Sequence, residues 1–158
     1  MPPVPILDVS KIDQSKVLLT RDQIYQVNPH LHEFQVLDGI FLIDTQARLM
    51  AGYMDARKDD FWVRCHIPGR PLLPGVLMIE AAAQMVGYYV MSRPGFEGFL
   101  GFGGVDKVKF RGQVVPGDRL IIAALLKEMR GKRRNVAETQ GFVNGQMVFE
   151  AVVTGIVI

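Results

Sequence analysis

The stretch of residues 66–84 constrains the fold more than any other part of the chain, because its two halves require different structures. Residues 66–75 contain three prolines and two glycines, with His66 at the start. Each proline fixes its own φ and biases the preceding residue towards an extended conformation, so this half is predicted to be a stiff loop. Residues 75–92 are almost entirely apolar and rich in Ala, Leu and Met, which predicts a buried helix.

Glu80 is the only carboxylate in this apolar helix, and Gln84 follows one turn later on the same face. A carboxylate in apolar surroundings is costly unless it has a partner or a function. Burial favours a protonated carboxyl group, which is the form that a general acid needs. Glu80 is therefore a candidate acid that Gln84 could orient. The alternatives are a buried partner for an arginine and a pair of polar groups at a subunit interface.

His66, Gly75 and Val76 are the other candidates in this stretch. A lone histidine is structural by default, but its ordinary range of titration also suits a general base. The first N–H groups of a helix have no intrahelical acceptor, so those of Gly75 and Val76 could stabilise an oxyanion. Alternatively, Gly75 only eases the loop into the helix.

The composition is that of an ordinary globular protein, with 158 residues, 49% apolar and 22% charged. A net charge of +2 is too small to argue for nucleic acid binding. The single cysteine, Cys65, excludes an intrachain disulfide, and packing is favoured over catalysis because adjacent residues of an extended segment point to opposite sides. Residues 1–5 do not resemble a signal peptide, and the apolar run at 76–90 is shorter than the roughly 20 residues of a membrane span, so a cytoplasmic protein is expected.

Around the long helix, the pattern predicts antiparallel strands and one domain over residues 1–158. Residues 1–20 are expected to form an arm that has little fixed structure and could pack onto the body or onto a partner. A short helix capped by Thr20 should follow the arm. Asn144-Gly145 is the strongest hairpin signal, since the pair suits a type I′ turn. A helix that is apolar on nearly all sides must be wrapped, which predicts an α+β fold with a curved sheet around it. The expected strands are 34–44, 49–56, 99–110, 120–129, 135–142 and 147–158.

Basic side chains offer a docking surface for an acidic partner, although the run at 130–134 is also typical of a solvated hairpin end. The candidates are Arg64, Arg70, Arg111, Lys132, Arg133 and Arg134. His30 and His32 lack a Cys or carboxylate grouping with metal-ligand spacing, so no metal site is expected.

Taken together, His66-x-Pro-Gly-Arg-Pro-x-x-Pro-Gly-Val-Leu-x-x-Glu-Ala-x-Ala-Gln resembles the motif of the FabZ-type 3-hydroxyacyl-[acyl-carrier-protein] dehydratases. Residues 34–38, 104–111 and 114–118 are similar to further family segments. The resemblance implies a hot-dog fold and dehydration of a (3R)-3-hydroxyacyl thioester without a metal or redox cofactor. It implies His66 as base, Glu80 as acid and the Gly75 N–H as oxyanion donor. It also implies an acyl carrier protein as partner, and a homodimer or trimer of dimers in which histidine and acid meet across an interface.

Four positions depart from the family pattern: Cys65, Ile67, Gly39 and Gln113 stand where glycine, phenylalanine, arginine and proline are usual. They concern chain-length preference and carrier docking more than the reaction. Glu80 in place of aspartate favours plain dehydration over a FabA-type dehydratase-isomerase. Two alternatives remain, a hot-dog thioesterase or enoyl hydratase and a non-catalytic acyl-thioester-binding subunit. The presence of both His66 and Glu80 argues against the second.

Overall fold

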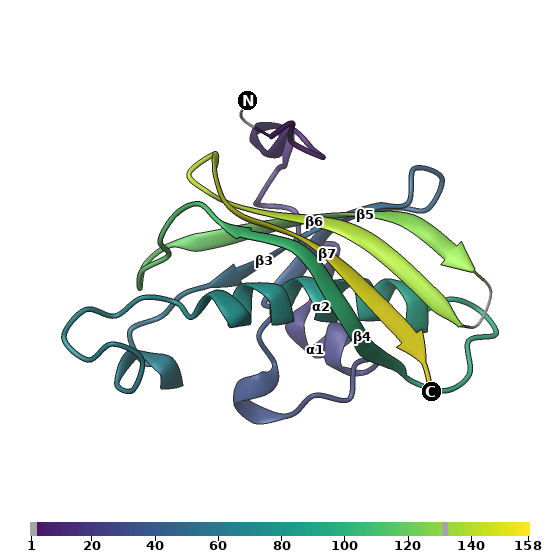
Figure 1. Ribbon diagram of the computed structural model, residues 1–158, viewed down its shortest axis with the longest axis horizontal. Coiled ribbons are helices and arrows are strands. Elements are labelled where there is room, and N and C mark those ends of the chain that lie inside the picture. The colour runs from purple at the N-terminus through teal and green to yellow at the C-terminus, as the bar shows by residue number, and fades with distance from the viewer. Residues whose placement is uncertain (1–2, 131–132) are drawn as a thin grey trace.

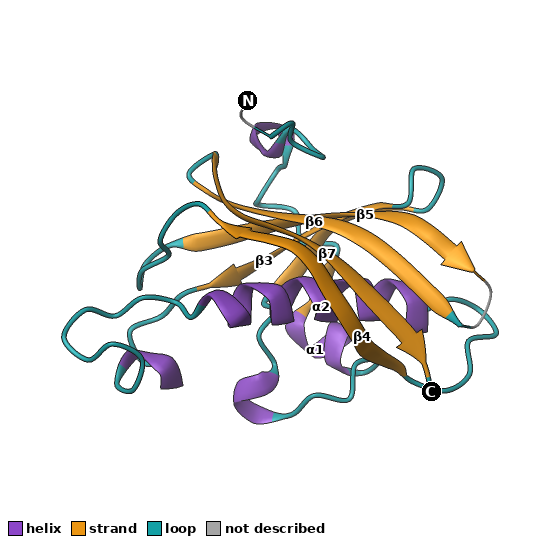
Figure 2. Cartoon of the chain, viewed as in Figure 1, coloured by secondary structure: helices purple, strands orange, loops and turns teal. Residues whose placement is uncertain are grey.

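A curved antiparallel sheet wraps one long helix, α2 (Gly75–Met91), in the computed structural model, which describes residues 3–130 and 133–158 (Figures 1 and 2). The strand order is β1-β2-β3-β5-β6-β7-β4, so β1 and β4 form the two edges of the sheet. This arrangement confirms the predicted α+β hot-dog fold. The strands are β1 (Leu19–Thr20), β2 (Gly39–Asp44), β3 (Leu49–Asp55), β4 (Leu100–Phe110), β5 (Arg119–Arg130), β6 (Arg134–Val143) and β7 (Gln146–Val157).

The sheet covers most of the circumference of α2, which explains why the helix is apolar on nearly every side. Ala81, Ala82 and Met85 are fully buried in the core between helix and sheet. One stripe of the helix is left uncovered. On it, Val76 is 70% exposed and the side chain of Glu80, one turn later, is 25% exposed. The described part of the chain contains no helix with the length and apolarity needed to cross a membrane.

The β6–β7 hairpin forms at the predicted place. Asn144 and Gly145 have φ values of 49° and 78°, and a type I′ turn requires positive φ at both central residues. The short helix α1 (Arg21–Tyr25) is also confirmed. Thr20 accepts the N–H of Gln23, and the Gln23 side chain accepts the N–H of Thr20, so the two form a capping box.

The strand predicted over residues 34–44 is wrong for its first part. A 3₁₀ helix, η2 (His32–Phe34), comes first, and strand β2 begins only at Gly39. Side chains form hydrogen bonds with the backbone groups of the segment between η2 and β2. Arg21 donates to the Gln35 carbonyl, and the Tyr25 hydroxyl accepts the N–H of Leu37. These contacts depend on the tertiary fold, so the apolar composition of the segment did not reveal them.

The arm packs onto the body, which is one of the two possibilities expected, but the prediction that it has little fixed structure is wrong for residues 3–20. They include a 3₁₀ helix, η1 (Val9–Lys11), and strand β1, which pairs with β2. Apolar arm side chains pack on the outer face of the sheet against Ile121 and Phe142. Gln140 of β6 also clamps the arm, accepting the N–H of Ile6 at 2.7 Å and donating to the Val4 carbonyl at 3.0 Å. This partner lies more than 130 residues away in the sequence, where local patterns carry no signal.

Candidate active site

Glu80 lies on the uncovered stripe of α2 and faces a cavity. The cavity is bounded by the helix, by the start of β4 and by the segment that follows α1, and its lining includes His30, Gln84, Gly87 and Phe102. The expectation that Glu80 is buried is therefore wrong for the single chain. Its side chain is a quarter exposed because the sheet curves around the opposite side of the helix. His66 is not among the residues that line this cavity.

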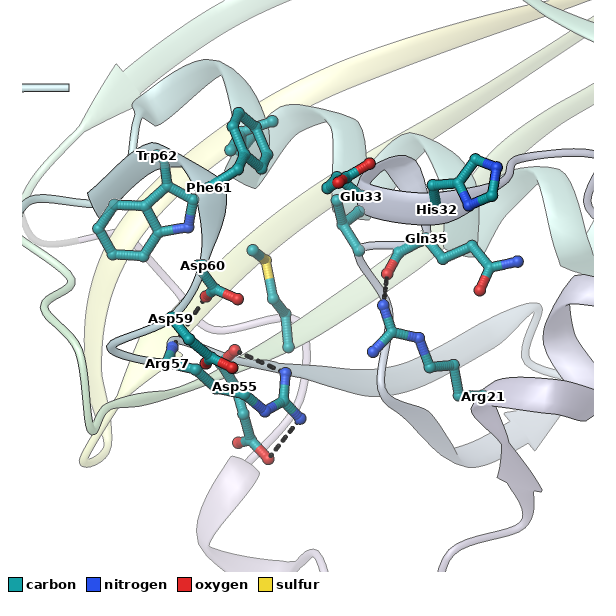
Figure 3. Close-up of a pocket in the computed structure, with 13 residues that line it drawn as sticks. Arg21, His32, Glu33, Gln35, Asp55, Arg57, Asp59, Asp60, Phe61 and Trp62 are labelled. Carbon is teal, nitrogen blue, oxygen red and sulfur yellow. Dashed lines mark hydrogen bonds and ion pairs between the residues drawn. The ribbon is translucent and has the colours of Figure 1, made fainter. Parts of the chain in front are cut away.

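A second cavity separates η2 from η3 (Phe61–Val63), the 3₁₀ helix before the proline-rich loop (Figure 3). Glu33 and Gln35 line one side, and Phe61 and Trp62 line the other. Trp62 is almost fully buried, and its Nε1 has no hydrogen-bond partner among the described residues. Neither His66 nor Glu80 lines this cavity, so it is separate from the predicted site.

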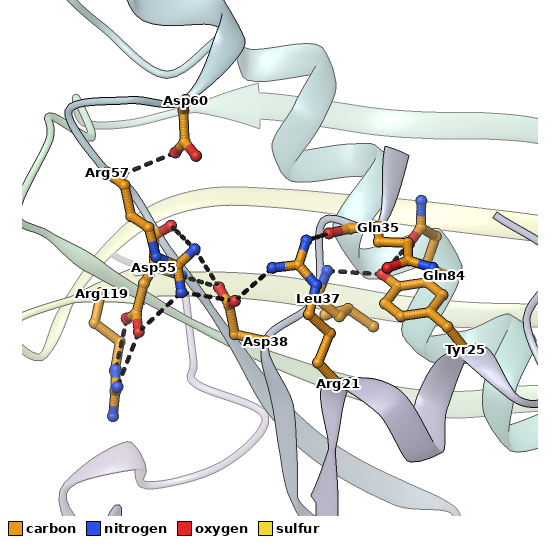
Figure 4. A network of polar contacts seen from close by, with 10 residues as sticks. All are labelled: Arg21, Tyr25, Gln35, Leu37, Asp38, Asp55, Arg57, Asp60, Gln84 and Arg119. Atoms are coloured by element: carbon orange, nitrogen blue, oxygen red, sulfur yellow. Dashed lines mark hydrogen bonds and ion pairs between the residues drawn. The ribbon is translucent and has the colours of Figure 1, made fainter. Parts of the chain in front are cut away.

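An ion-pair network anchored on Asp38 fixes the segment after η2 (Figure 4). The Asp38 carboxylate accepts hydrogen bonds from Arg57 at 2.8 Å and Arg21 at 3.3 Å, and from the N–H of Asp55 at 2.7 Å. The bond to Asp38 raises the pKa of the Arg57 guanidinium, which thus remains charged. Because the side chain of Asp38 is only 8% exposed, the network holds residues 35–38 firmly beside α2.

Gly39 follows Asp38 where the family usually has arginine, and the structure gives a reason. A Cβ atom at this position would lie 2.6 Å from a ring carbon of Tyr53, which stacks on Phe41 on the outer face of the sheet. Any larger side chain would therefore displace a packed aromatic ring.

Gln84 connects Glu80 to the anchored segment. It is almost fully buried, and its Nε2 donates to Glu80 Oε1 and to the Phe34 carbonyl, both at 2.8 Å. Its Oε1 accepts the Tyr25 hydroxyl at 2.6 Å, and that hydroxyl accepts the N–H of Leu37 at 2.8 Å (Figure 4). The expected contact between Gln84 and Glu80 is thus present in the structure.

His30 is a residue of the site that the sequence analysis did not find. Its Nε2 lies 3.5 Å from Glu80 Oε1, and its Nδ1 is buried without a hydrogen-bond partner among the described residues. The ring stands edge-on to Tyr25 with 6.3 Å between the ring centroids. In the sequence, His30 has no neighbours with metal-ligand spacing, and its contact with a residue fifty positions later leaves no local pattern.

His66 occupies the entrance of the proline-rich loop, directly after η3. Its N–H donates to the Trp62 carbonyl at 2.8 Å, and its ring Nδ1 lies 2.8 Å from the Leu72 carbonyl. The loop turns back on itself between these contacts, with positive φ at Ile67 and Gly69. It projects beyond the N-terminal end of α2 (Figure 1).

Gly75 begins α2 as predicted, and the residue before it, Pro74, makes no side-chain cap to the first turn. A Cβ atom at Gly75 would lie 2.6 Å from the Phe110 ring, so glycine lets the end of β4 approach the start of the helix. Gly75 is therefore required for packing against Phe110, and this requirement is compatible with the predicted role of its N–H as an oxyanion donor. Val76, the next candidate, is exposed.

The predicted docking residues do not form one patch on the single chain. Arg70 is exposed on the proline-rich loop and Arg64 is exposed two residues before it, whereas the adjoining ends of β5 and β6 lie at the opposite end of the molecule in Figure 1. Next to these ends, Arg133 is exposed and Arg134 pairs with Glu128 at 3.6 Å, while Lys132 falls outside the described residues. Arg111 pairs with Glu150 at 3.2 Å. In the described part of the chain, no group of three or more His, Cys, Asp or Glu side chains is arranged to hold a metal ion.

Comparison with solved structures defines the class of fold. The chain is similar to the dehydratase heterocomplex ApeI:P from Xenorhabdus doucetiae, with a TM-score of 0.72, 16% identity, and coverage of 89% of this chain and 91% of the other. It is also similar to a putative thioesterase related to phenylacetic acid degradation from Ralstonia eutropha, with a TM-score of 0.61, 15% identity, and coverage of 75% and 83%. At such identities the likeness shows the hot-dog fold alone.

Sequence comparison defines the family. Residues 28–152 match the model of the FabA-like domain. The chain is 38% identical over 140 residues to the 3-hydroxyacyl-[acyl-carrier-protein] dehydratase FabZ of Enterococcus faecalis, covering 86% of this chain and 96% of that one. It is 35% identical over 137 residues to the FabZ of Pelotomaculum thermopropionicum, covering 85% and 95%. The chain therefore belongs to the FabA-like family and, within it, to the FabZ-type dehydratases.

Proposed function

We propose that this chain converts (3R)-3-hydroxyacyl thioesters carried by acyl carrier protein to trans-2-enoyl thioesters, with His66 as general base and Glu80 as general acid. The curated relatives are named for this reaction on this carrier. In the proposed dehydration, the C2–H proton passes to His66 and the C2=C3 double bond forms. The C3–O bond breaks, and the hydroxyl leaves as water with a proton from Glu80.

The contact of the His66 ring with Leu72 is the observation that carries the proposal. Nδ1 lies 2.8 Å from the Leu72 carbonyl, and a carbonyl oxygen can only accept a hydrogen bond. In the neutral ring Nδ1 therefore carries the proton, and Nε2 is left with the lone pair. A histidine oriented by its own backbone with Nε2 bare has the form that a general base needs.

Glu80 has the complementary setting. Its carboxyl group faces a cavity beside the apolar α2 and is held there by Gln84. A hydroxyl group leaves only when it is protonated, so an acid fixed in this position supplies what the base cannot. The N–H groups of Gly75 and Val76 at the start of α2 suit the oxyanion that develops on the thioester, with Gln84 as the amide that orients the acid.

The complete site is proposed to need two copies of the chain. The proline-rich loop that begins at His66 projects past the end of α2, and His66 does not line the cavity of its own Glu80. The uncovered stripe of α2 and the edge strand β4 are available for pairing, and β4 exposes Phe102, Val105 and Phe110. An exposed apolar edge strand is a template for pairing with another chain. A second copy placed there would bring each His66 to the partner's acid.

The partner would be an acidic acyl carrier protein, with Arg64, Arg70 and Arg111 as the docking residues nearest to the loop of His66. A cytoplasmic location fits an enzyme of this reaction. The reaction itself requires proton transfers, and the proposed residues supply them without a metal or redox cofactor.

Hydration of a crotonyl thioester, the reverse reaction, tests the function through loss of the enoyl absorbance. The wild type is expected to consume the substrate, and His66→Ala and Glu80→Gln should each lower kcat by about 10²-fold or more while retaining their thermal midpoints. Release of free thiol without hydration would identify a thioesterase instead. Wild-type activity in Glu80→Gln would exclude the acid assignment.

A further inference from the structure

We infer that Tyr25, acting through Gln84, is a positioning residue that fixes which oxygen of Glu80 carries the catalytic proton. The inference rests on the proposed role of Glu80 as the acid. It concerns a series of hydrogen bonds that runs from the N–H of Leu37 through Tyr25 and Gln84 to Glu80, with a further bond from Gln84 to the carbonyl of Phe34. The two backbone groups, at Leu37 and Phe34, determine which atom donates in each bond.

The first backbone group is the N–H of Leu37, which can only donate. It donates to the Tyr25 hydroxyl oxygen at 2.8 Å, so the hydroxyl proton must point elsewhere. The nearest acceptor is Gln84 Oε1 at 2.6 Å. The oxygen end of the Gln84 amide is therefore turned towards Tyr25, and the nitrogen end towards Glu80.

The second backbone group is the carbonyl of Phe34, which can only accept. Gln84 Nε2 lies 2.8 Å from it, which independently assigns the nitrogen to that side of the amide. The remaining N–H of the same nitrogen points at Glu80 Oε1, also at 2.8 Å. Both backbone groups thus give one orientation of the amide, and Oε1 of Glu80 must act as an acceptor.

His30 contacts the same oxygen of Glu80. Its Nε2 lies 3.5 Å from Oε1, and none of the contacts described above reaches Oε2. A neutral carboxyl group carries its proton on one oxygen and accepts on the other. With Oε1 occupied as acceptor, the proton resides on Oε2, from which it can pass to the leaving hydroxyl.

Tyr25 is suited to hold this orientation under all assay conditions. Burial raises the pKa of its hydroxyl, so the group stays a donor throughout the neutral and moderately alkaline range. Without the Tyr25 hydroxyl, Gln84 Oε1 is left buried without a donor, and of the two backbone groups only the Phe34 carbonyl still favours this orientation. A larger share of the amides would then turn over and present an oxygen to Glu80 Oε1. The proton would then be drawn to Oε1 and away from the substrate.

The test is a double-mutant cycle with Tyr25→Phe, Gln84→Leu and the two combined, measured by crotonyl thioester hydration. Tyr25→Phe is expected to lower kcat about tenfold, the effect of one hydrogen bond, with less than about a twofold change in KM. If Tyr25 acts only through Gln84, the combined variant will be no slower than Gln84→Leu alone. Tyr53→Phe, which removes a hydroxyl on the outer face of the sheet, is the matched control and should retain wild-type kcat.

Gln84→Glu provides a second test that keeps the shape of the side chain and its bond with Tyr25. It places an oxygen opposite Glu80 Oε1, so a proton shared between the two carboxyl groups is held away from Oε2, and kcat should fall as far as in Gln84→Leu. Wild-type kcat in Tyr25→Phe or Gln84→Glu, or losses that multiply in the double variant, would overturn the inference. An inactive wild type would instead reject the proposed function, so the two failures are distinguishable.

Discussion

One carboxyl oxygen of Glu80, Oε1, has two nitrogen neighbours, which lie at different distances from it. Gln84 Nε2 is at hydrogen-bonding distance, 2.8 Å, whereas His30 Nε2 at 3.5 Å is too far for a strong bond. Catalytic hydrogen bonds are often long before substrate binds and tighten in the reacting complex. We therefore expect His30 to close on Glu80 as the acid gives up its proton and becomes a carboxylate.

Replacing His30 tests this expectation. Glutamine places an amide nitrogen close to the position of Nε2, so His30→Gln should retain most of kcat. Phenylalanine keeps the ring but removes the donor, so His30→Phe should lower kcat by about tenfold with little change in KM. Steady-state hydration kinetics, with thermal midpoints to correct for misfolding, give both values. Equal rates for the two variants would show that a nitrogen donor at this position does not contribute to kcat.

The difference between the site residues found in the sequence and those found only in the structure follows from sequence separation. His66, Gly75, Glu80 and Gln84 lie in one short stretch whose prolines and helical spacing predict their placement. Tyr25 and His30 reach the site from α1 and the segment after it, fifty or more residues before their partners Gln84 and Glu80. Their polar atoms meet Gln84 and Glu80 only once the chain has folded, so no local pattern could identify them.

At the scale of elements, the arm is attached to the sheet through one buried side chain. Gln140 is 8% exposed and bonds to the arm backbone on both sides, at Ile6 and Val4. The arm thereby covers Ile121 and Phe142, which would otherwise form an apolar patch on the outer face. The cavity of the proposed active site lies on the other side of the sheet, so the arm and the chemistry should be separable.

Gln140→Leu should therefore loosen the arm and leave catalysis intact. Losing the clamp is expected to cost about 1–2 kcal/mol of unfolding free energy, because two hydrogen bonds are lost while the freed backbone groups can reach water. Denaturant unfolding and the rate of proteolysis within residues 3–20 would report this, together with an unchanged kcat. Gln46→Leu, in the exposed β2–β3 turn, is the matched control, and equal stability of the two variants would show that Gln140 does not hold the arm.

Elements that depend on local signals can be predicted from this sequence, whereas those that depend on tertiary contacts cannot. The predictions of α2 and of the β6–β7 hairpin are correct because a long apolar run rich in Ala, Leu and Met and an Asn-Gly turn are local signals. The apolar composition of residues 34–44 predicts a strand, yet Arg21 and Tyr25 occupy backbone groups of residues 35–37 that a strand would use. Tertiary hydrogen bonds overrode the local preference there, as they did in the arm.

At the scale of the whole molecule, each chain carries two proposed half-sites that lie apart, one in the proline-rich loop and one on α2. The loop of His66 extends beyond one end of α2, while Glu80 opens onto the stripe of the helix that no strand covers. A symmetric dimer would use the same surface on both copies, so pairing would complete two sites at once. This arrangement gives a quantitative prediction that a site within one chain does not share.

Mixing the inactive variants His66→Ala and Glu80→Gln, after unfolding and refolding them together, should restore activity. In a mixed dimer, the intact His66 of one copy meets the intact Glu80 of the other, and the second site has neither. Random pairing makes half of the dimers mixed, each with one working site of two, so about a quarter of the wild-type rate should return. Refolding each variant alone controls for residual activity. No recovery after mixing, with mixed dimers verified by distinct affinity tags, would place both residues of each site in a single chain.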